Sequence, residues 1–171
     1  MLKIINDLEP FFEDCYRRVN VREYAKIMRI SPPTASKLLS SYNAKNLLLR
    51  GTYKNYILFY ANKENKDFID LSRIYWRHKL KGFLHFMETK LTNPTIILFG
   101  SLSKAEVKPD SDVDLAIFAY KKELDIRAFE KKIKRKIQMF WFESIKDVEN
   151  KELANNITNG YVLRGRISGL G

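Results

Sequence analysis

The chain of 171 residues has a single cysteine, Cys15, and no apolar run approaching the roughly 18 residues that a membrane helix needs. One cysteine excludes an intrachain disulfide and any metal site built from several cysteines, so we expect Cys15 to be a buried structural thiol. The N-terminal residues include acidic side chains at once and lack an apolar signal core. These absences favour a cytoplasmic protein with no membrane partner.

The composition and the charge bound the class of protein. Hydrophobic residues at 45% and charged residues at 30% are typical of a folded chain, and the length allows one ordinary domain or two small ones. The net charge of +11 is uneven, because residues 1–90 carry 17 lysines and arginines against 9 acidic residues, and residues 91–171 carry 14 against 11. The excess suggests an anionic partner for the first half. The alternative is a generally basic protein whose charge only aids solubility.

The first half predicts three helices and a hairpin. Apolar residues spaced along residues 2–14 are typical of an amphipathic helix. A second helix over residues 21–28 ends before two prolines, and Ser31 can cap a third helix over residues 34–42 with the prolines in its first turn. Two β-prone runs, 47–50 and 56–60, surround a polar turn with a glycine and predict a β-hairpin.

This order of elements is typical of a winged helix-turn-helix. Residues 21–62 resemble the winged-helix domains of archaeal and bacterial transcription regulators, through the phrases Val-Arg-Glu-Tyr-Ala and Ser-Pro-Pro-Thr-Ala-Ser-Lys-Leu-Leu. We therefore expect residues 1–65 to form a DNA-binding domain, whose paired recognition helices in a homodimer would read two half-sites. Protein–protein adaptors use the same fold, and no target sequence is evident. The expected DNA contacts lie at the start of the recognition helix and on the wing: Thr34, Ser36, Lys37, Arg50 and Lys54.

A second domain is expected over residues 66–171. Apolar residues at helical spacing over residues 66–91 predict one long helix, or two joined near Gly82, that connects the halves and packs on the sheet that follows. His78 and His85 lie in this segment with no third ligand nearby, so we interpret both as structural.

The motif that carries chemistry begins with the buried strand predicted at residues 95–99, which ends in Gly100-Ser101. A glycine lets the backbone approach a ligand closely, and the Ser101 hydroxyl and the following N–H groups can hold phosphate oxygens. Ten residues later stands Asp112-Val113-Asp114, followed by a second buried strand over residues 115–118. Because side chains alternate along a strand, Asp112 and Asp114 project to the same side. Two like charges favour a cation, and Mg²⁺ (or Mn²⁺) suits them for an in-line displacement at phosphorus.

This layout of Gly-Ser, ten residues and Asp-x-Asp, over about residues 80–170, resembles the minimal nucleotidyltransferases of the DNA polymerase beta superfamily. The resemblance implies that residues 66–171 form a nucleotidyltransferase domain with a small mixed sheet, so the chain as a whole is expected to be α+β. It also implies transfer of NMP, usually AMP, from an NTP such as ATP, with Gly100 and Ser101 on the triphosphate and Asp112 and Asp114 on the metals. Lys104 and Ser111 are further candidates for phosphate contact, although a solvated loop position suits Lys104 equally well.

The family normally adds a third carboxylate on a later strand, which here is predicted over residues 136–142. Gln138 stands at that position, and a glutamine can bond a metal-bound water but cannot take a proton at neutral pH. Glu143 lies just past the strand and would have to swing in from its end. Three readings stay open: the enzyme uses Glu143 as a catalytic carboxylate, it works slowly with two carboxylates, or it binds nucleotide and metal without turnover.

Two functions compete at this point. The leading hypothesis is a DNA-associated, Mg²⁺-dependent nucleotidyltransferase whose acceptor is a protein, a nucleic-acid end or a small molecule; family analogy raises AMPylation of a toxin partner by an antitoxin. The second is a transcription regulator that only senses a nucleotide. A purely structural adaptor is a third possibility.

Three remaining segments have structural interpretations. The basic run 131–136 is interpreted as a solvated helix face, the stretch 155–165 as a helix end and closing strand, and residues 169–171 as a frayed tail.

Overall fold

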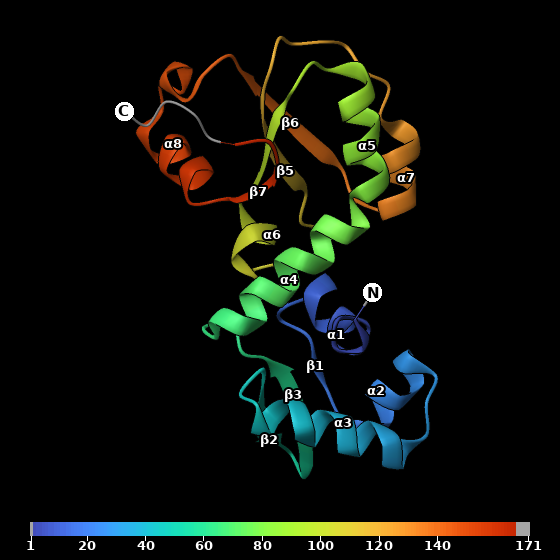
Figure 1. Cartoon of the computed structure of the whole chain (residues 1–171). Helices are drawn as coiled ribbons and strands as arrows, with labels where there is room; N and C mark the ends of the chain where they lie inside the picture. Colours follow the sequence, from blue (N-terminus) through green and yellow to red (C-terminus); the bar gives the residue numbers. More distant parts are fainter. Residues whose placement is uncertain (1, 167–171) are drawn as a thin grey trace. The chain divides into compact units, whose positions relative to one another are not determined.

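The computed structural model describes residues 2–166, which form two compact units (Figure 1). The first unit runs to Tyr75 and also includes Ala105–Pro109, and the second comprises Trp76–Lys104 and the residues from Asp110 onward. The division therefore lies inside helix α4 (Lys66–Lys79), later than the boundary expected at residue 65, and a short loop of the second half belongs to the first unit. The expected tail at residues 169–171 lies outside the described residues.

The first unit combines helices with a three-stranded antiparallel sheet of order β1-β3-β2. The three predicted helices and the predicted hairpin are confirmed, whereas β1 was not predicted, because a strand of two residues carries no pattern. The elements that precede α4 are α1 (Lys3–Glu13), β1 (Arg18–Val19), α2 (Val21–Met28), α3 (Pro32–Ala44), β2 (Leu48–Tyr53) and β3 (Tyr56–Ala61).

Local signals explain where these helices begin. The side chain of Asn20 accepts a hydrogen bond from the Glu23 N–H while the Glu23 carboxylate accepts from the Asn20 N–H, so a capping box starts α2. As predicted, Ser31 caps α3, its Oγ accepting from the Thr34 N–H at 3.4 Å.

Buried Asp7 ties α1 to the next two helices. The Tyr42 hydroxyl donates to Asp7 Oδ2 at 2.6 Å, and the Tyr24 hydroxyl donates to the Asp7 carbonyl oxygen at 2.7 Å. Burial raises the pKa of both tyrosines, and the neighbouring Asp7 raises it further. Their hydroxyls therefore stay protonated and keep donating. Lys3 completes the network with an ion pair to Asp7 at 2.7 Å.

Aromatic packing holds the first part of α4 in the first unit, and a backbone hydrogen bond holds the loop 105–109 there. The Phe12 ring lies 5.1 Å from the Phe68 ring and 5.5 Å from the Tyr75 ring, centroid to centroid. Cys15 is buried, as predicted, and its N–H donates to the carbonyl oxygen of buried Val107 at 2.8 Å.

The second unit is built on a four-stranded mixed sheet of order β6-β5-β4-β7, in which only β5 and β6 are parallel. The strands predicted at residues 95–99, 115–118 and 136–142 and the closing strand are confirmed. The elements are α5 (Lys81–Lys90), β4 (Thr95–Phe99), α6 (Ser101–Lys104), β5 (Val113–Phe118), α7 (Arg127–Ile133), β6 (Ile137–Phe142), the 3-10 helix η1 (Ile145–Asp147), α8 (Lys151–Thr158) and β7 (Tyr161–Arg164).

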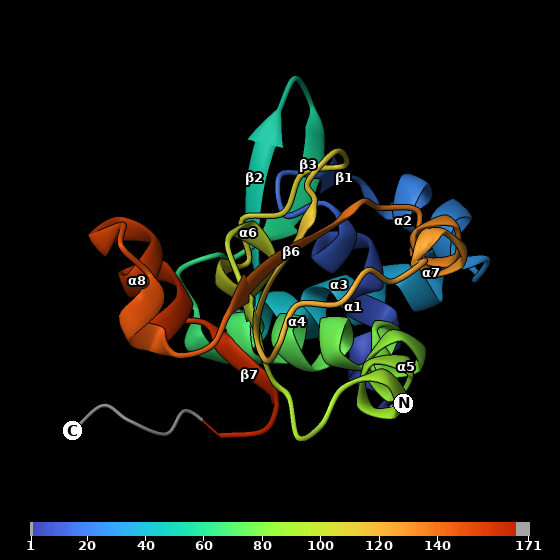
Figure 2. The same cartoon turned by 90° about the horizontal axis from the view of Figure 1, so that it is seen from above.

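Both faces of this sheet are covered by helices. Figures 1 and 2 show α5 and α7 on one side of the sheet and α8 on the other. The central strands are accordingly apolar on both faces, with Ile96, Ile97 and Leu98 of β4 fully buried. The helix expected over residues 66–91 is two helices that meet at Leu80, close to Gly82. No helix within residues 2–166 combines the length and the apolar character that crossing a membrane requires.

Candidate active site

The turn after β4 brings the backbone against a carboxylate. Gly100 has φ +69°, and a Cβ built on it would fall inside contact distance of Asp114 Oδ2 and 3.2 Å from Asp114 Cγ. Any side chain at this position would push that carboxylate away. The turn is held by Ser103, whose Oγ and N–H donate to the Gly100 carbonyl oxygen at 2.9 and 3.2 Å.

Strand β5 presents the two aspartates. Val113 is fully buried. Asp114, the next residue of the strand, pairs with Phe99 of the neighbouring strand β4. Asp112 immediately precedes the strand. Burial raises the pKa of the Asp114 carboxyl, and the negative charge of Asp112 raises it further. The two carboxylates therefore act on one another, and a cation would relieve both effects.

Gln138 completes the cluster from the neighbouring strand. It pairs with Asp114 in the parallel register of β5 and β6, and its Nε2 donates to Asp112 Oδ2 at 2.5 Å. Within residues 2–166, no group of three or more acidic, histidine or cysteine side chains could hold a metal ion. The side-chain oxygen ligands that this cluster offers a cation are thus two carboxylates and one amide.

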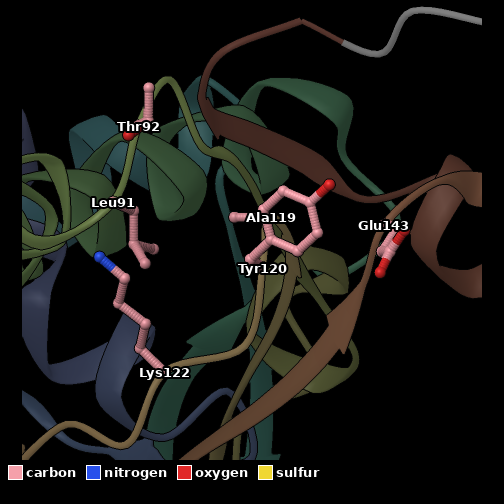
Figure 3. A pocket seen from close by; sticks show the side chains of 6 residues that line it. All are labelled: Leu91, Thr92, Ala119, Tyr120, Lys122 and Glu143. Atoms are coloured by element: carbon pink, nitrogen blue, oxygen red, sulfur yellow. The ribbon is translucent and has the colours of Figure 1, made fainter.

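Glu143 does not join this cluster. Because β5 and β6 run in parallel, the strand end that Glu143 follows is the end where Phe118 pairs with Phe142, away from the Asp114–Gln138 pair. Five residues of strand separate Gln138 from Glu143, on the order of 16 Å. Glu143 instead lines a cavity of about 410 Å³ at that far end (Figure 3), with Leu91, Thr92, Ala119, Tyr120 and Lys122. The idea that Glu143 swings in from the end of the strand is not supported by this register.

The two weaker phosphate candidates have partners within the second unit. Lys104 is exposed and its Nζ donates to Asn156 Oδ1 at 2.8 Å, so contact with a phosphate would require this bond to break. Ser111 offers its carbonyl oxygen to Arg135 Nη1 at 2.7 Å. Ser101, beside Gly100, is the first residue of α6.

Arg135 was missed as a contributor to the site. The basic run 131–136 was interpreted as a solvated helix face, but Arg135 is only 8% exposed, and its guanidinium lies 5.1 Å from the centroid of the Trp76 ring. Through its bond to Ser111 it holds the residue just before Asp112. Strand alternation could not have found it, because Arg135 lies in a bend before β6 begins at Ile137.

The candidate DNA-contacting residues belong to the first unit. Thr34, Ser36 and Lys37 are exposed on the first half of α3. Arg50 on β2 and Lys54 in the hairpin turn are exposed as well.

One part of the chain, which contains this cluster, is similar to a known family. Residues 85–166 match the model of a family described as "Polymerase beta, Nucleotidyltransferase". The match covers β4 to β7 and contains Gly100, Asp112, Asp114 and Gln138. It supports a nucleotidyltransferase-type domain in the second unit, in agreement with the resemblance of the motif. No curated protein and no solved structure matches the chain.

Proposed function

We propose that the second unit is a Mg²⁺-dependent nucleotidyltransferase that moves NMP, with ATP as the expected donor, to a protein or nucleic-acid acceptor. We further propose that the first unit is a winged helix that binds DNA. The observation that carries the enzymatic part is the convergence of the Gly100 turn with the carboxylates of Asp112 and Asp114. The family match over residues 85–166 supports it independently.

The donor set fits a magnesium ion. Mg²⁺ is usually held by one or two carboxylates, with waters and substrate phosphates at the other positions, and Asp112 and Asp114 supply two carboxylates. The raised pKa of Asp114 means that its charged form is poorly compensated by the protein alone. When bound, the cation would neutralise negative charge on the phosphates. The Gly100 turn, which carries no side chain, would let the triphosphate approach the backbone closely.

The residues of the chain define what the reaction can use. An acceptor hydroxyl oxygen forms a bond to the α-phosphorus of the NTP while the bond from that phosphorus to the pyrophosphate oxygen breaks, and pyrophosphate leaves. The hydroxyl proton needs an acceptor, and the amide of Gln138 cannot take it. The proton then passes to water, so we expect slow turnover.

A label-transfer assay tests the enzyme. The full chain is incubated with α-³²P-labelled ATP, GTP, CTP and UTP and with Mg²⁺ or Mn²⁺, alone and with a cell extract. We expect label on an acceptor, lost in Asp112→Ala and Asp114→Ala and kept in Asp110→Ala, a matched control at an exposed aspartate just upstream. Transfer that survives both active-site substitutions would show that another protein carries the activity.

A nucleotide-sensing regulator is the second candidate, and Gln138 is the observation that favours it. Its amide donates to Asp112 where the related enzymes carry an acid. The sensor predicts Mg²⁺-dependent nucleotide binding, seen as thermal stabilisation, without label transfer at any enzyme concentration. A toxin partner would appear among the labelled proteins of the extract only if the enzyme hypothesis holds.

The DNA-binding part rests on exposed polar residues along α3 and the hairpin. Binding of duplex DNA from a random-sequence pool should weaken in Lys37→Ala and persist in Lys45→Ala, a control at the opposite end of α3. A phosphate contact also predicts that Lys37→Ala lowers the dependence of affinity on salt. Equal affinities for both variants would remove α3 from the interface.

A further inference from the structure

The sheet of the first unit has one apolar face and one face rich in tyrosine. Side chains alternate along antiparallel strands, so residues paired across strands share a face. Leu48, Phe59 and Ala61 are buried on one face. The opposite face carries Tyr53 paired with Tyr56, and Tyr60 paired with Arg18 of β1. We call these three tyrosines the tyrosine face.

The tyrosine face is open where the hairpin ends. Tyr53 is 61% exposed and Tyr56 is 63% exposed, although large aromatic side chains are usually packed away. Gly51 lies on the same face, and a Cβ there would sit 3.5 Å from Cε1 of Tyr60. Glycine at this position adds no side chain of its own over that part of the half-buried Tyr60 ring. Figure 2 shows the long β2–β3 hairpin that carries these residues.

Cations accompany the aromatic rings of this unit. The Arg18 guanidinium lies 4.7 Å from the centroid of the Tyr60 ring, and Lys54 Nζ lies 5.6 Å from that of Tyr53. Tyr16, which lies just before β1, is also exposed. Lys63 Nζ lies 3.9 Å and Lys108 Nζ lies 5.7 Å from the centroid of its ring. A cation over one face of a ring leaves the other face for a base, and the same cation can contact a phosphate.

We propose that the tyrosine face binds single-stranded nucleic acid, with bases stacked on Tyr53, Tyr56 and Tyr60 and phosphates contacting Arg18 and Lys54. In a duplex the base faces are stacked on one another, so open aromatic rings select unstacked bases. The spacing fits more than one base. Tyr56 and Tyr60 stand four residues apart on β3, about 13 Å, whereas Tyr53 and Tyr56 are directly opposite one another, about 5 Å apart between Cβ atoms.

This site goes beyond the proposed function. Duplex recognition was assigned to α3 and the hairpin, through hydroxyls and lysine, whereas the tyrosine face uses aromatic rings and takes a different ligand. Lys54 is the one residue that both assignments share. The test therefore changes the tyrosines and leaves Lys54 and α3 intact, so that failure of either idea is distinguishable from failure of the other.

Binding is measured by fluorescence anisotropy with the full chain and three fluorescein-labelled probes of equal length: oligo-dT, oligo-rU and a DNA duplex. The variants are Tyr53→Ser with Tyr56→Ser, the same pair changed to Phe, and Tyr120→Ser. Tyr120 is a matched control, because it is 79% exposed and belongs to the second unit. The DNA and RNA probes distinguish the two sources of a single strand.

We expect the wild-type chain to bind at least one single-stranded probe, and the double Ser variant to bind it at least tenfold more weakly, since stacking on one aromatic ring contributes roughly fivefold to 150-fold in affinity. The double Phe variant should bind like wild type, because the rings remain, and Tyr120→Ser should be unaffected. A separate Lys63→Ala variant tests whether the binding face extends to Tyr16, whose ring Lys63 contacts. If it does, the substitution should reduce the magnitude of the slope of log affinity against log salt by about 0.7.

Four results would overturn the proposal. The first is no binding of either single-stranded probe. The second is equal affinity of the wild type and the double Ser variant. The third is a tyrosine-dependent affinity that is higher for the duplex than for both single strands, which would make this face part of the duplex interface. The fourth is a loss of binding in the double Phe variant, which keeps both rings, because binding would then not depend on stacking. Binding retained in the Phe variant excludes a folding defect as the cause of a loss in the double Ser variant.

Discussion

Replacing Gly100 with alanine should separate the shape of the active-site turn from the stability of the unit that contains it. The new Cβ would fall inside contact distance of Asp114 Oδ2, so the carboxylate must rotate away from its place beside Asp112. The backbone would also keep φ +69°, a left-handed conformation that costs a residue with a Cβ about 1–2 kcal/mol. Gly100→Ala should therefore lower both stability and metal affinity.

The expected sizes follow from the length of the full chain, 171 residues, for which 1 kcal/mol shifts Tm by roughly 2–4 °C. The backbone cost alone then lowers the Tm of Gly100→Ala by about 2–8 °C. For the wild type, Mg²⁺ with ATP at about ten times Kd adds about 1.4 kcal/mol and raises Tm. Gly100→Ala should show the lower Tm and little or no increase in Tm when Mg²⁺ and ATP are added.

The assay is a thermal unfolding series with and without Mg²⁺ and ATP, run in parallel on Gly82→Ala. Gly82 is exposed in α5, where a Cβ would meet only Phe129 Cε1 at an ordinary 4.0 Å. Alanine should stabilise that helix by roughly 0.5–1 kcal/mol and leave the ligand-induced rise unchanged. The reasoning is refuted if Gly100→Ala keeps the full rise, since the carboxylate would then not depend on the missing Cβ.

Three further predictions concern charge and hydrogen bonding. Asp114→Asn should stabilise the metal-free protein at neutral pH. Because the pKa of Asp114 is raised in the folded state, its carboxyl contributes its full stability only below the unfolded pKa, and that contribution is lost as pH rises through the native pKa. Asparagine is neutral at every pH and avoids this loss. Unfolding by urea from pH 3 to 8 checks this, and curves that stay parallel would contradict it. Tyr42→Phe removes a donor to buried Asp7 and should lower the free energy of unfolding by about 1.5–3 kcal/mol, whereas an unchanged urea midpoint would show the bond to be dispensable. Gln138→Glu places a third carboxylate beside the pair; it should destabilise the metal-free protein, tighten Mn²⁺ binding measured by calorimetry and speed label transfer, and a decrease in both binding and transfer would speak against a metal site.

The core of the fold was predictable because its signals are local. The apolar, β-branched run at 95–99 could only be a buried strand, and the parity of Asp112, Val113 and Asp114 placed Val113 inside. Ser31 and the prolines after it marked the start of α3 for reasons that concern only their own backbone. Such features do not depend on distant parts of the chain.

The features that escaped prediction depend on tertiary structure. Glu143 follows the predicted strand in sequence, but whether it lies near Asp112 depends on the direction of β6 relative to β5, and no local pattern encodes strand direction. Arg135 looked like one charge among six residues of a basic run, and only its contacts with Ser111 and Trp76 distinguish it. The Arg18 partner of the tyrosine face required the register of β1, a strand too short to predict.

The loop Ala105–Pro109 makes the two units interleaved along the chain. It connects the end of α6, which follows the Gly100 turn, to the segment that precedes Asp112, yet it folds with the first unit through buried Ala105 and Val107. No single cut of the polypeptide can separate the units, because excision at residue 75 leaves this loop without the residues that bury it. Along the chain, the Gly100 turn and Asp112 are thus connected by a loop that belongs to the first unit. A gene fragment that encodes only one of the two units would therefore be structurally incomplete.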